Sequence, residues 1–241
     1  MTTEHIPPVA ATIGLHGSAS TWVFNVVREL MIAAAGEDRV LALYADEVAQ
    51  IPDETARAGR SLVVKSHHGS AGLDDWLREA GAPLFLSVRD PRDAAVSMAQ
   101  RFKAPLDHAA EWLANDCERM TRLAAGGLTP LLRYEDRFFE HKAVIAQLAV
   151  RLGLQPSSET IDAVFDRYRT EAVRDFARSL PDLPPERLTM VGAFAMDKVT
   201  QILAPHIGDG VSGKWRTLPG LTRVRLTRRF RPFLQRFGYP D

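Results

Sequence analysis

Short apolar runs alternate along the chain with longer segments that have helical spacing. The apolar runs, each bounded by turn residues, cover 9–15, 40–44, 61–65, 83–88 and 131–134. Runs of this length with few polar residues are typical of strands that are buried on both faces of a sheet. The pattern therefore predicts these segments as the strands of a central sheet.

Segments with apolar residues at helical spacing lie between and after these runs, and they predict helices. They cover 22–35, 74–80, 91–102, 106–125, 142–152 and 159–179. Glycines follow three of them as stops: Gly36, Gly81, and the pair Gly126 and Gly127. Strands that alternate with helices of this length predict an α/β fold, with a parallel sheet covered by helices on both faces.

The last third of the chain has a different pattern. Residues 181–186 and 208–220 are rich in Pro or Gly and predict loops. A basic run without any acid follows: Lys214, Arg216, Arg223, Arg225, Arg228, Arg229, Arg231 and Arg236. Two interpretations stay open, a solvated Arg-rich terminal helix or arm and a segment that closes over an anionic ligand.

Composition narrows the class of protein. Of the 241 residues, 46% are hydrophobic and 25% charged, which is ordinary for a folded soluble protein and excludes a disordered chain. Lys plus Arg and Asp plus Glu each total 30, a balance that argues against a nucleic-acid partner. The single cysteine, Cys117, indicates a reducing compartment. Because no run of 18 apolar residues and no signal-peptide pattern occur, we expect no membrane partner and a cytoplasmic location.

Polar residues follow three of the predicted strands, where parallel α/β sheets bind ligands. The first segment, 13–22, brings small residues and the hydroxyls of Ser18, Ser20 and Thr21 to a helix start. Free backbone N–H groups at a helix start attract anions. The segment contains no Lys and is not a Walker A loop. An ordinary Ser or Thr helix cap is the alternative interpretation.

The second segment, 63–69, ends a strand with Lys65, His67 and His68. Histidine suits proton abstraction near neutral pH. A zinc site would need further ligands at suitable spacing, and the chain has one Cys and no HExxH pattern. We therefore expect an acid–base site without a metal.

The third segment, 84–102, delivers Arg89 to a turn in which Asp90 caps and Pro91 begins a helix. Arginine can bind a phosphate through two parallel hydrogen bonds. A surface ion pair between Arg89 and Asp93 is the alternative interpretation.

Taken together, these segments resemble the sulfotransferases that use 3′-phosphoadenosine 5′-phosphosulfate (PAPS). The similar motifs are GLHGSASTW at 14–22, KSH at 65–67, VRDPRDAAVS at 88–97, LLRYED at 131–136, GVSGKW at 210–215 and LQRFGY at 234–239. They come in the family's order and span nearly the whole chain. The resemblance implies one sulfotransferase domain over 1–241, with a P-loop NTPase-like α/β fold in which 205–241 closes over the donor site.

The resemblance also implies roles for individual residues. The 5′-phosphosulfate would lie on the loop that carries Ser18, Ser20 and Thr21, and the 3′-phosphate on Arg89 and Ser97. The full set implied to bind PAPS is Gly17, Ser18, Ala19, Ser20, Thr21, Trp22, Arg89, Ser97, Tyr134, Gly210, Lys214 and Trp215. Within it, Trp22 would stack on adenine, or else simply pack in the core, and Tyr134 would hydrogen-bond the base. His67 would be the general base, and Lys65 would stabilise charge on the transferring sulfuryl group.

The chain departs from the family pattern where the family carries cations. Gly17 stands where the family has Lys or Arg. In the late loop, Gly208 and Asp209 stand where the family has basic residues. Ala19 replaces a glycine and would crowd the phosphate if its φ were positive. We expect a protonated His16 to replace part of the missing charge, with Lys65, Lys214 or Arg216 supplying the rest.

The expected reaction is transfer of a sulfuryl group from PAPS to a hydroxyl or amine of a small-molecule or glycan acceptor. The alternative from another class is a PAP-binding or nucleotide-binding protein of the same fold without turnover. A P-loop kinase or NTPase is a third interpretation, but the Walker Lys and a clear magnesium carboxylate are lacking. Residues 106–112 and 176–194, with Phe138 and Phe139, are candidates for the acceptor wall, and core packing is their alternative role. The oligomeric state stays open.

Overall fold

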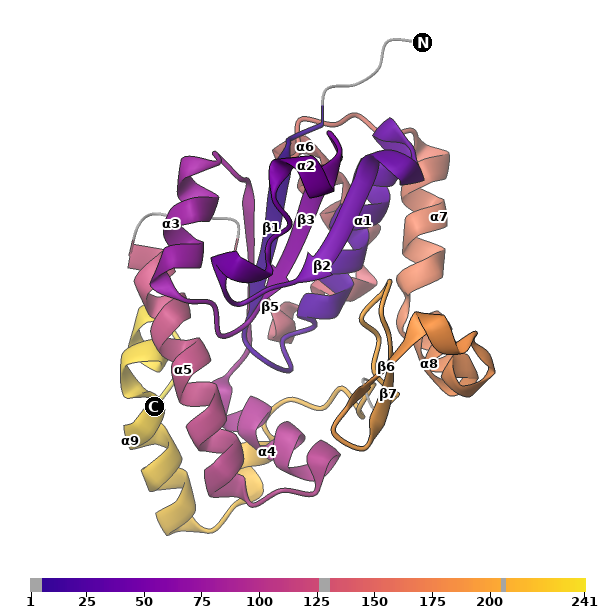
Figure 1. Cartoon of the computed structure of the whole chain (residues 1–241). Helices are drawn as coiled ribbons and strands as arrows, with labels where there is room; N and C mark the ends of the chain where they lie inside the picture. Colours follow the sequence, from indigo (N-terminus) through magenta and orange to yellow (C-terminus); the bar gives the residue numbers. More distant parts are fainter. Residues whose placement is uncertain (1–5, 126–130, 205–206) are drawn as a thin grey trace.

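The computed structural model describes residues 6–125, 131–204 and 207–241. Its centre is a parallel sheet in the order β2-β3-β1-β4-β5 (Figure 1). The strands are β1 Val9–Gly14, β2 Val40–Tyr44, β3 Ser61–Ser66, β4 Leu84–Val88 and β5 Leu131–Arg133. The predicted parallel α/β sheet is thereby confirmed, and each strand lies within two residues of its expected bounds.

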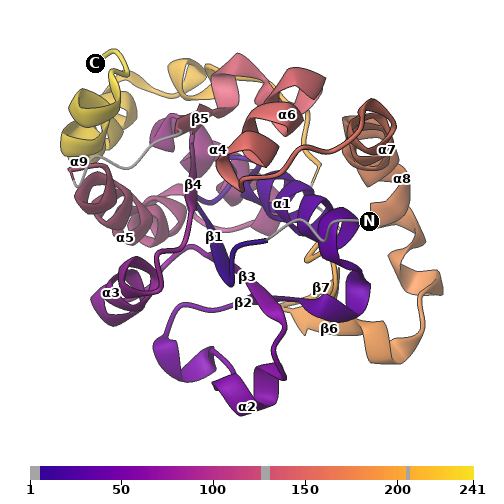
Figure 2. The same ribbon diagram turned by 90° about the horizontal axis from the view of Figure 1, so that it is seen from above.

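Helices cover both faces of this sheet (Figure 2). One face carries α3 Ala71–Glu79, α4 Pro91–Phe102, α5 Leu106–Ala125 and α9 Gly220–Phe237, and the other carries α1 Ser20–Ala35, α6 Lys142–Arg151 and α7 Ser158–Tyr168. Alternate residues of β1 enter the two cores, with Ala11 on the first side and Ala10 on the second. Two-sided burial explains why the strands read as continuous apolar runs. The predicted stop of α5 at Gly126 and Gly127 lies outside the described residues.

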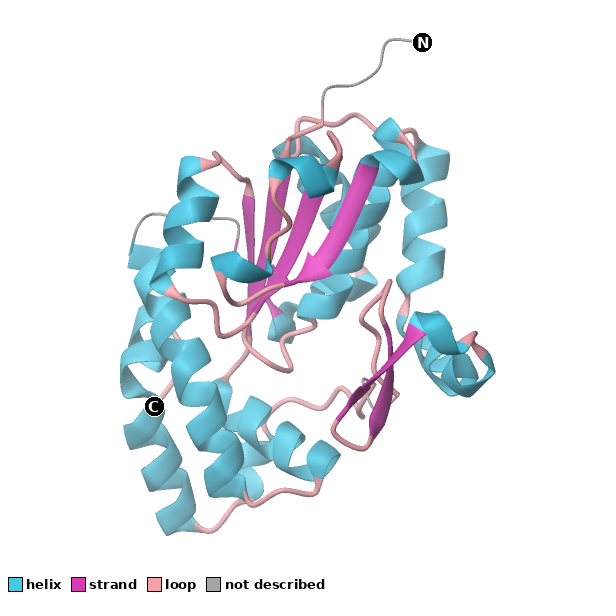
Figure 3. Ribbon diagram, viewed as in Figure 1, coloured by secondary structure: helices cyan, strands magenta, loops and turns pink. Residues whose placement is uncertain are grey.

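Three parts of the fold differ from the sequence prediction. The segment 159–179 is not one helix: extended backbone at Arg169 (ψ 154°) separates α7 from α8 Thr170–Ser179. An antiparallel hairpin of β6 Leu188–Val191 and β7 Phe194–Asp197 stands apart from the central sheet (Figure 3). A short helix, α2 Glu54–Arg57, was also not expected. These elements are short, so their periodicity is too brief to predict them.

The basic run near the C-terminus is largely helical. α9 buries Leu226, Phe230, Phe233, Leu234 and Phe237 and packs along α5. Within α9 the first interpretation, an Arg-rich terminal helix, is therefore confirmed, and closure of the segment before α9 over an anionic ligand stays a prediction. No helix in the described ranges combines the length and apolar character needed to cross a bilayer.

The carboxyl ends of the strands meet at one edge of the sheet, where their arrowheads point in Figure 1. Gly14 of β1 lies beside Ser87 of β4, and Ile13 lies beside Ser66 of β3. The segments that follow these strands therefore emerge side by side. This register brings the three polar segments of the sequence to one place.

Candidate functional site

A cavity of about 600 Å³ lies at this edge of the sheet. The predicted site residues that line it are His16, Gly17, Ala19, Ser20, Thr21, Trp22, His67, Arg89, Ser97, Tyr134, Gly210 and Lys214. Three others, Ser18, Lys65 and Trp215, do not line it. Of the segment 205–241 that was expected to close over the donor, 207–210 and Lys214 line the cavity, whereas α9 packs on α5.

The loop between β1 and α1 has the backbone of an anion site. Gly17 and Ala19 both have positive φ, 79° and 61°. Ala19 is the N-cap of α1 and makes no side-chain cap bond, so the alternative interpretation, a Ser or Thr cap, is wrong. The loop therefore leads into a helix start without a side-chain cap, and backbone N–H groups at such a start attract anions. A non-glycine residue in the left-handed region costs about 1 kcal/mol, so Ala19 is strained at this loop.

Ser18 lies behind the cavity wall and does not line it. Its hydroxyl donates to Leu15 O at 2.6 Å and lies 2.8 Å from Ser87 Oγ. Both contacts tie the loop to itself and to β4, and Ser18 is fully buried. A hydroxyl engaged in this way stabilises the turn, and the hydroxyls on the cavity wall are those of Ser20 and Thr21.

Arg89 follows β4 and reaches across the cavity mouth. It is 4% exposed, and its guanidinium donates to Gly17 O at 3.2 Å and to Val211 O at 3.1 Å. It also lies 4.1 Å above the centre of the Tyr134 ring. Arg89 thus joins the first loop, the late loop and the end of β5 around one space.

Asp93 has a role that the sequence did not suggest. The alternative interpretation, an Arg89–Asp93 surface ion pair, is wrong, because the buried Asp93 carboxylate accepts from Gly213 N and from Trp215 N, the latter at 3.0 Å. Trp215 is buried, with Arg92 Cζ 3.7 Å from its ring centre. Trp215 therefore anchors the late loop to α4 and does not face the cavity.

The late loop neutralises its own acid. Lys214 Nζ lies 2.6 Å from Asp209 Oδ1. The hydrogen bond from Lys214 to Asp209 holds the pKa of the Asp209 carboxyl below its ordinary value. The negative charge of Asp209, which would repel an anionic donor, is therefore neutralised by Lys214. The same ion pair occupies the charge of Lys214.

Lys65 supports the first loop from behind. It is 5% exposed, and its Nζ donates to Thr21 Oγ1 at 2.7 Å. Burial, and after it the positive charge of Arg101, lower the pKa of Lys65 to about 7. The ammonium group is thus close to its titration point at neutral pH.

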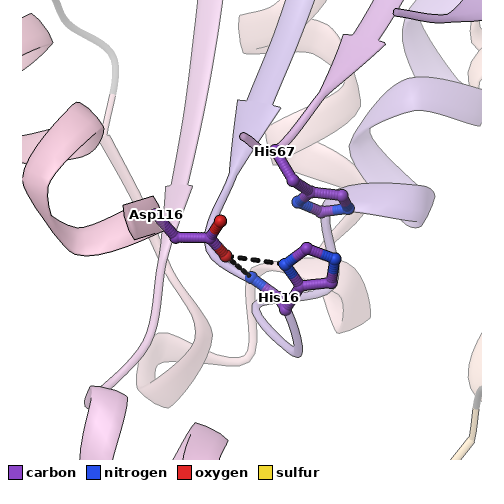
Figure 4. A group of neighbouring side chains, drawn as sticks. All are labelled: His16, His67 and Asp116. Carbon is purple, nitrogen blue, oxygen red and sulfur yellow. Dashed lines mark hydrogen bonds and ion pairs between the residues drawn. The ribbon is translucent and has the colours of Figure 1, made fainter. Parts of the chain in front are cut away.

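Three histidines, His16, His67 and His68, gather around Asp116 of α5, and Figure 4 shows Asp116 with the first two. Asp116 Oδ2 accepts from His16 N at 2.9 Å and lies 2.7 Å from His16 Nδ1, and Oδ1 lies 2.8 Å from His68 Nδ1. Burial opposes ionisation of Asp116, but His16 and His68 hold its pKa well below the ordinary range. The hydrogen bond to Asp116 raises the pKa of His68.

His67 lies in the same cluster in a different environment. Its Nδ1 bonds to Gly14 O, and its ring stacks on His16 with 3.8 Å between ring centres. Burial, followed by the charges of His16 and Lys65, lowers the pKa of His67 well below its ordinary value. With Nδ1 bonded to a carbonyl, Nε2 is the atom left to accept a proton.

The cluster fits acid–base chemistry better than metal binding. Ligand atoms of His16, His67 and Asp116 lie within 4.8 Å of one another. However, the two rings are stacked with 26° between their planes, so one ion cannot lie in the plane of both. Nδ1 of each ring is also already bonded, one to Asp116 and the other to Gly14 O.

Asp116 and Arg119 are site residues that the sequence analysis missed. Arg119 donates to Ser66 Oγ and to His67 O, at 2.7 and 3.1 Å, and so holds the turn after β3. An added Cβ at Gly69 would lie 2.3 Å from Arg119 Nη2, which explains the glycine. The signal for both was present, because each is a charged residue on the otherwise apolar face of the helix 106–125.

Two buried donors on the wall fit an anionic, aromatic ligand. In the described part of the chain, Trp22 Nε1 and Arg89 Nε have no hydrogen-bond partner. Such orphaned donors are rare in folded proteins and are satisfied by ligands or water. Trp22 also packs edge-on against Phe138, with 5.5 Å between ring centres, so its packing role is confirmed, while its role toward adenine stays a prediction.

The candidate acceptor wall is only partly brought together. Phe138 is buried in the second core, whereas Phe139 lines the cavity. Trp112 of α5 is 41% exposed and lies 5.5 Å from the His16 ring. Phe194 of β7 lies 5.8 Å from Phe102. An apolar surface therefore adjoins the histidines.

Sequence comparisons find no relative: no family model and no curated protein matches the chain. Solved structures do match its fold. Mouse sulfotransferase SULT7A1 complexed with PAP has a TM-score of 0.62 at 10% identity, over 99% of this chain and 87% of that chain. Retinol dehydratase in complex with retinol and PAP has a TM-score of 0.60 at 16% identity, and the match covers 97% of this chain and 83% of that chain. Retinol dehydratase in complex with androsterone and inactive cofactor PAP has a TM-score of 0.62 at 16% identity, and the match covers 97% of this chain and 82% of that chain. The chain therefore has the sulfotransferase fold that its motifs predicted.

Proposed function

We propose that this protein transfers a sulfuryl group from PAPS to a hydroxyl or amine of a small-molecule or glycan acceptor. The observation that carries the proposal is the meeting of two anion-binding elements in one cavity. One is the uncapped start of α1 with its loop at Gly17 and Ala19, and the other is Arg89 with Ser97 on α4. Structures of the same fold contain PAP.

The chain's residues suit the parts of the donor. The α1 N–H groups and the Thr21 hydroxyl, which Lys65 holds, would bind the 5′-phosphosulfate. Arg89 and Ser97 would bind the 3′-phosphate. Trp22 and Tyr134 would hold the adenine between an indole face and a phenol.

The transfer step needs alignment and a proton acceptor. The acceptor oxygen or nitrogen forms a bond to sulfur while the bond from sulfur to the bridging phosphate oxygen breaks, and PAP leaves. The acceptor proton goes to His67 Nε2. Because the pKa of His67 is lowered, this nitrogen is unprotonated at neutral pH and ready to accept it. His16 with its Asp116 partner, and Lys65, surround the group in transfer.

A second candidate function rests on the missing cations. Gly17 brings no charge to the loop, and Lys214 is paired with Asp209. Losing one such group typically costs about 10²–10³ in rate. The alternative is therefore a protein that binds PAP without turnover. As a further part of the proposal, the balanced charge disfavours a nucleic-acid partner, and the free, buried Cys117 suits a reducing compartment such as the cytoplasm.

The first experiment is a thermal shift with PAP, with AMP and ATP as controls. At 100 times its Kd, a ligand adds about 2.7 kcal/mol to the free energy of unfolding. We expect PAP to stabilise the protein more than AMP or ATP does. No stabilisation by PAP would overturn both candidates, because each requires the donor site. Release of PAP from PAPS with a panel of phenols, alcohols and amines then separates the enzyme from the silent binder.

A further inference from the structure

Gly17 leaves an opening that points along α4. A Cβ added there would lie 3.9 Å from Ala94 Cβ and 3.9 Å from Arg89 Nη1. A cationic side chain at this position would therefore extend over the face of α4 that carries Ala94. Because Gly17 has no side chain, the loop between β1 and α1 places no positive charge above this face of α4.

The same face carries another basic residue further along the helix. Ala94, Ser97 and Arg101 are spaced i, i+3 and i+7, so they lie on one face of α4. Ser97 and Arg101 both line the cavity. Helical side chains lean toward the N-terminus of their helix, so we expect the side chain of Arg101 to lean back along α4 in the direction of Ser97.

The charge of Arg101 acts on the residues of the proposed donor site. Burial and then the charge of Arg89 lower the pKa of Arg101, while Tyr134 raises it. The charge of Arg101 in turn lowers the pKa of Lys65. Arg101 thus lies within electrostatic reach of all three residues. Cations gathered in a half-buried cavity repel one another unless an anion joins them.

Lys65, another basic group of the proposed donor site, is less suited to hold a phosphate. Lys65 donates to Thr21, and its pKa of about 7 leaves it only partly charged at neutral pH. A guanidinium stays charged throughout this range and can bind a phosphate oxygen pair.

We propose that Arg101 binds the 5′-phosphosulfate end of the donor and supplies the positive charge that Gly17 lacks. This inference rests on the proposed donor function. It makes Arg101 a binding residue that compensates, from a different element of the fold, for a cation absent from the loop.

The test compares Arg101→Gln and Arg101→Lys with the wild-type protein in calorimetric titrations. Lys103→Gln is the matched control, because Lys103 is an exposed cation on the same helix end that does not line the cavity. The ligands are PAP, adenosine 5′-monophosphate and adenosine 3′-monophosphate. They separate contacts to the 5′ end from contacts to the 3′ end.

We expect Arg101→Gln to weaken PAP and the 5′-monophosphate by about tenfold or more, the value of a charge-assisted hydrogen bond. The 3′-monophosphate should bind as before, Arg101→Lys should keep most of the affinity, and Lys103→Gln should change little. If Arg101→Gln does not fold, Arg101→Met is the second variant.

Unchanged PAP binding in the folded Arg101 variants would overturn the inference while the donor function stands. A loss confined to the 3′-monophosphate would also overturn it, because Arg101 would then serve the other phosphate. Wild-type protein that fails to bind PAP would instead overturn the proposed function itself.

Discussion

Replacing Lys65 with Met should change how the stability of the protein depends on pH. Lys65 is 5% exposed, and its pKa falls from 10.5 to about 7 because burial, and then the charge of Arg101, disfavour the ammonium form. Between these two values the unfolded chain binds a proton at Lys65 that the folded chain has released. The free energy of unfolding must therefore rise with pH in this range.

The size of the effect follows from the two pKa values. One pKa unit corresponds to 1.36 kcal/mol. Folded Lys65 is half protonated near pH 7 and almost fully deprotonated at pH 9, whereas the unfolded chain stays protonated over this interval. Integration over the interval gives a gain of about 2 kcal/mol for the wild type, which the Met variant lacks.

Urea unfolding at several pH values between 7 and 9, followed by tryptophan fluorescence, measures this gain. The stability of the wild type minus that of Lys65→Met should increase by about 2 kcal/mol across the range. Lys103→Met removes an exposed cation and is the control, for which the difference should stay nearly constant. A Lys65 difference that is flat, or that falls with rising pH, would refute the claim that Lys65 is buried at the cost of its charge.

Three further predictions concern the histidine cluster. His67→Ala should abolish turnover and leave PAP binding intact, measured by PAP release and by thermal shift; full activity would remove His67 as the base. His16→Gln should lower turnover by about tenfold or more if His16 replaces part of the missing charge, and unchanged turnover would remove that role. Asp116→Asn should destabilise the protein at pH 7, because the folded pKa of Asp116 lies well below its unfolded value. Since that stabilisation is lost as the pH falls toward the folded pKa, the difference from wild type in urea unfolding should shrink below about pH 4, and a difference independent of pH would contradict the ion-pair argument.

The agreement between sequence and structure is greatest where local physics decides. The strand at 83–88 and the helix that Asp90 and Pro91 begin follow from apolar runs, a capping side chain and a fixed proline φ. These features act over a few residues. They were predictable without knowing what lies beside them.

Short elements and breaks were not predictable in this way. Nothing in the apolar spacing of 159–179 distinguishes one helix from two. The break at Arg169 comes directly after Tyr168, whose hydroxyl donates to Glu29 of α1 at 2.9 Å. The hairpin of β6 and β7 is likewise too short to show a period of its own. Contacts with distant parts of the chain decide such segments.

The candidate site also has features that local sequence predicts and features that distant contacts decide. The sequence by itself determined which polar segments end the strands. A parallel sheet must bring those ends to one edge, so the part of the cavity wall that these segments build was predictable. Only the tertiary structure decided the direction of each side chain. The Ser18 hydroxyl donates to Leu15 O, and the Asp93 carboxylate accepts from the late loop. Asp116 accepts from His16, although the two residues are 100 positions apart in the sequence. Direction depends on partners that fold alongside, and no spacing along the chain encodes them.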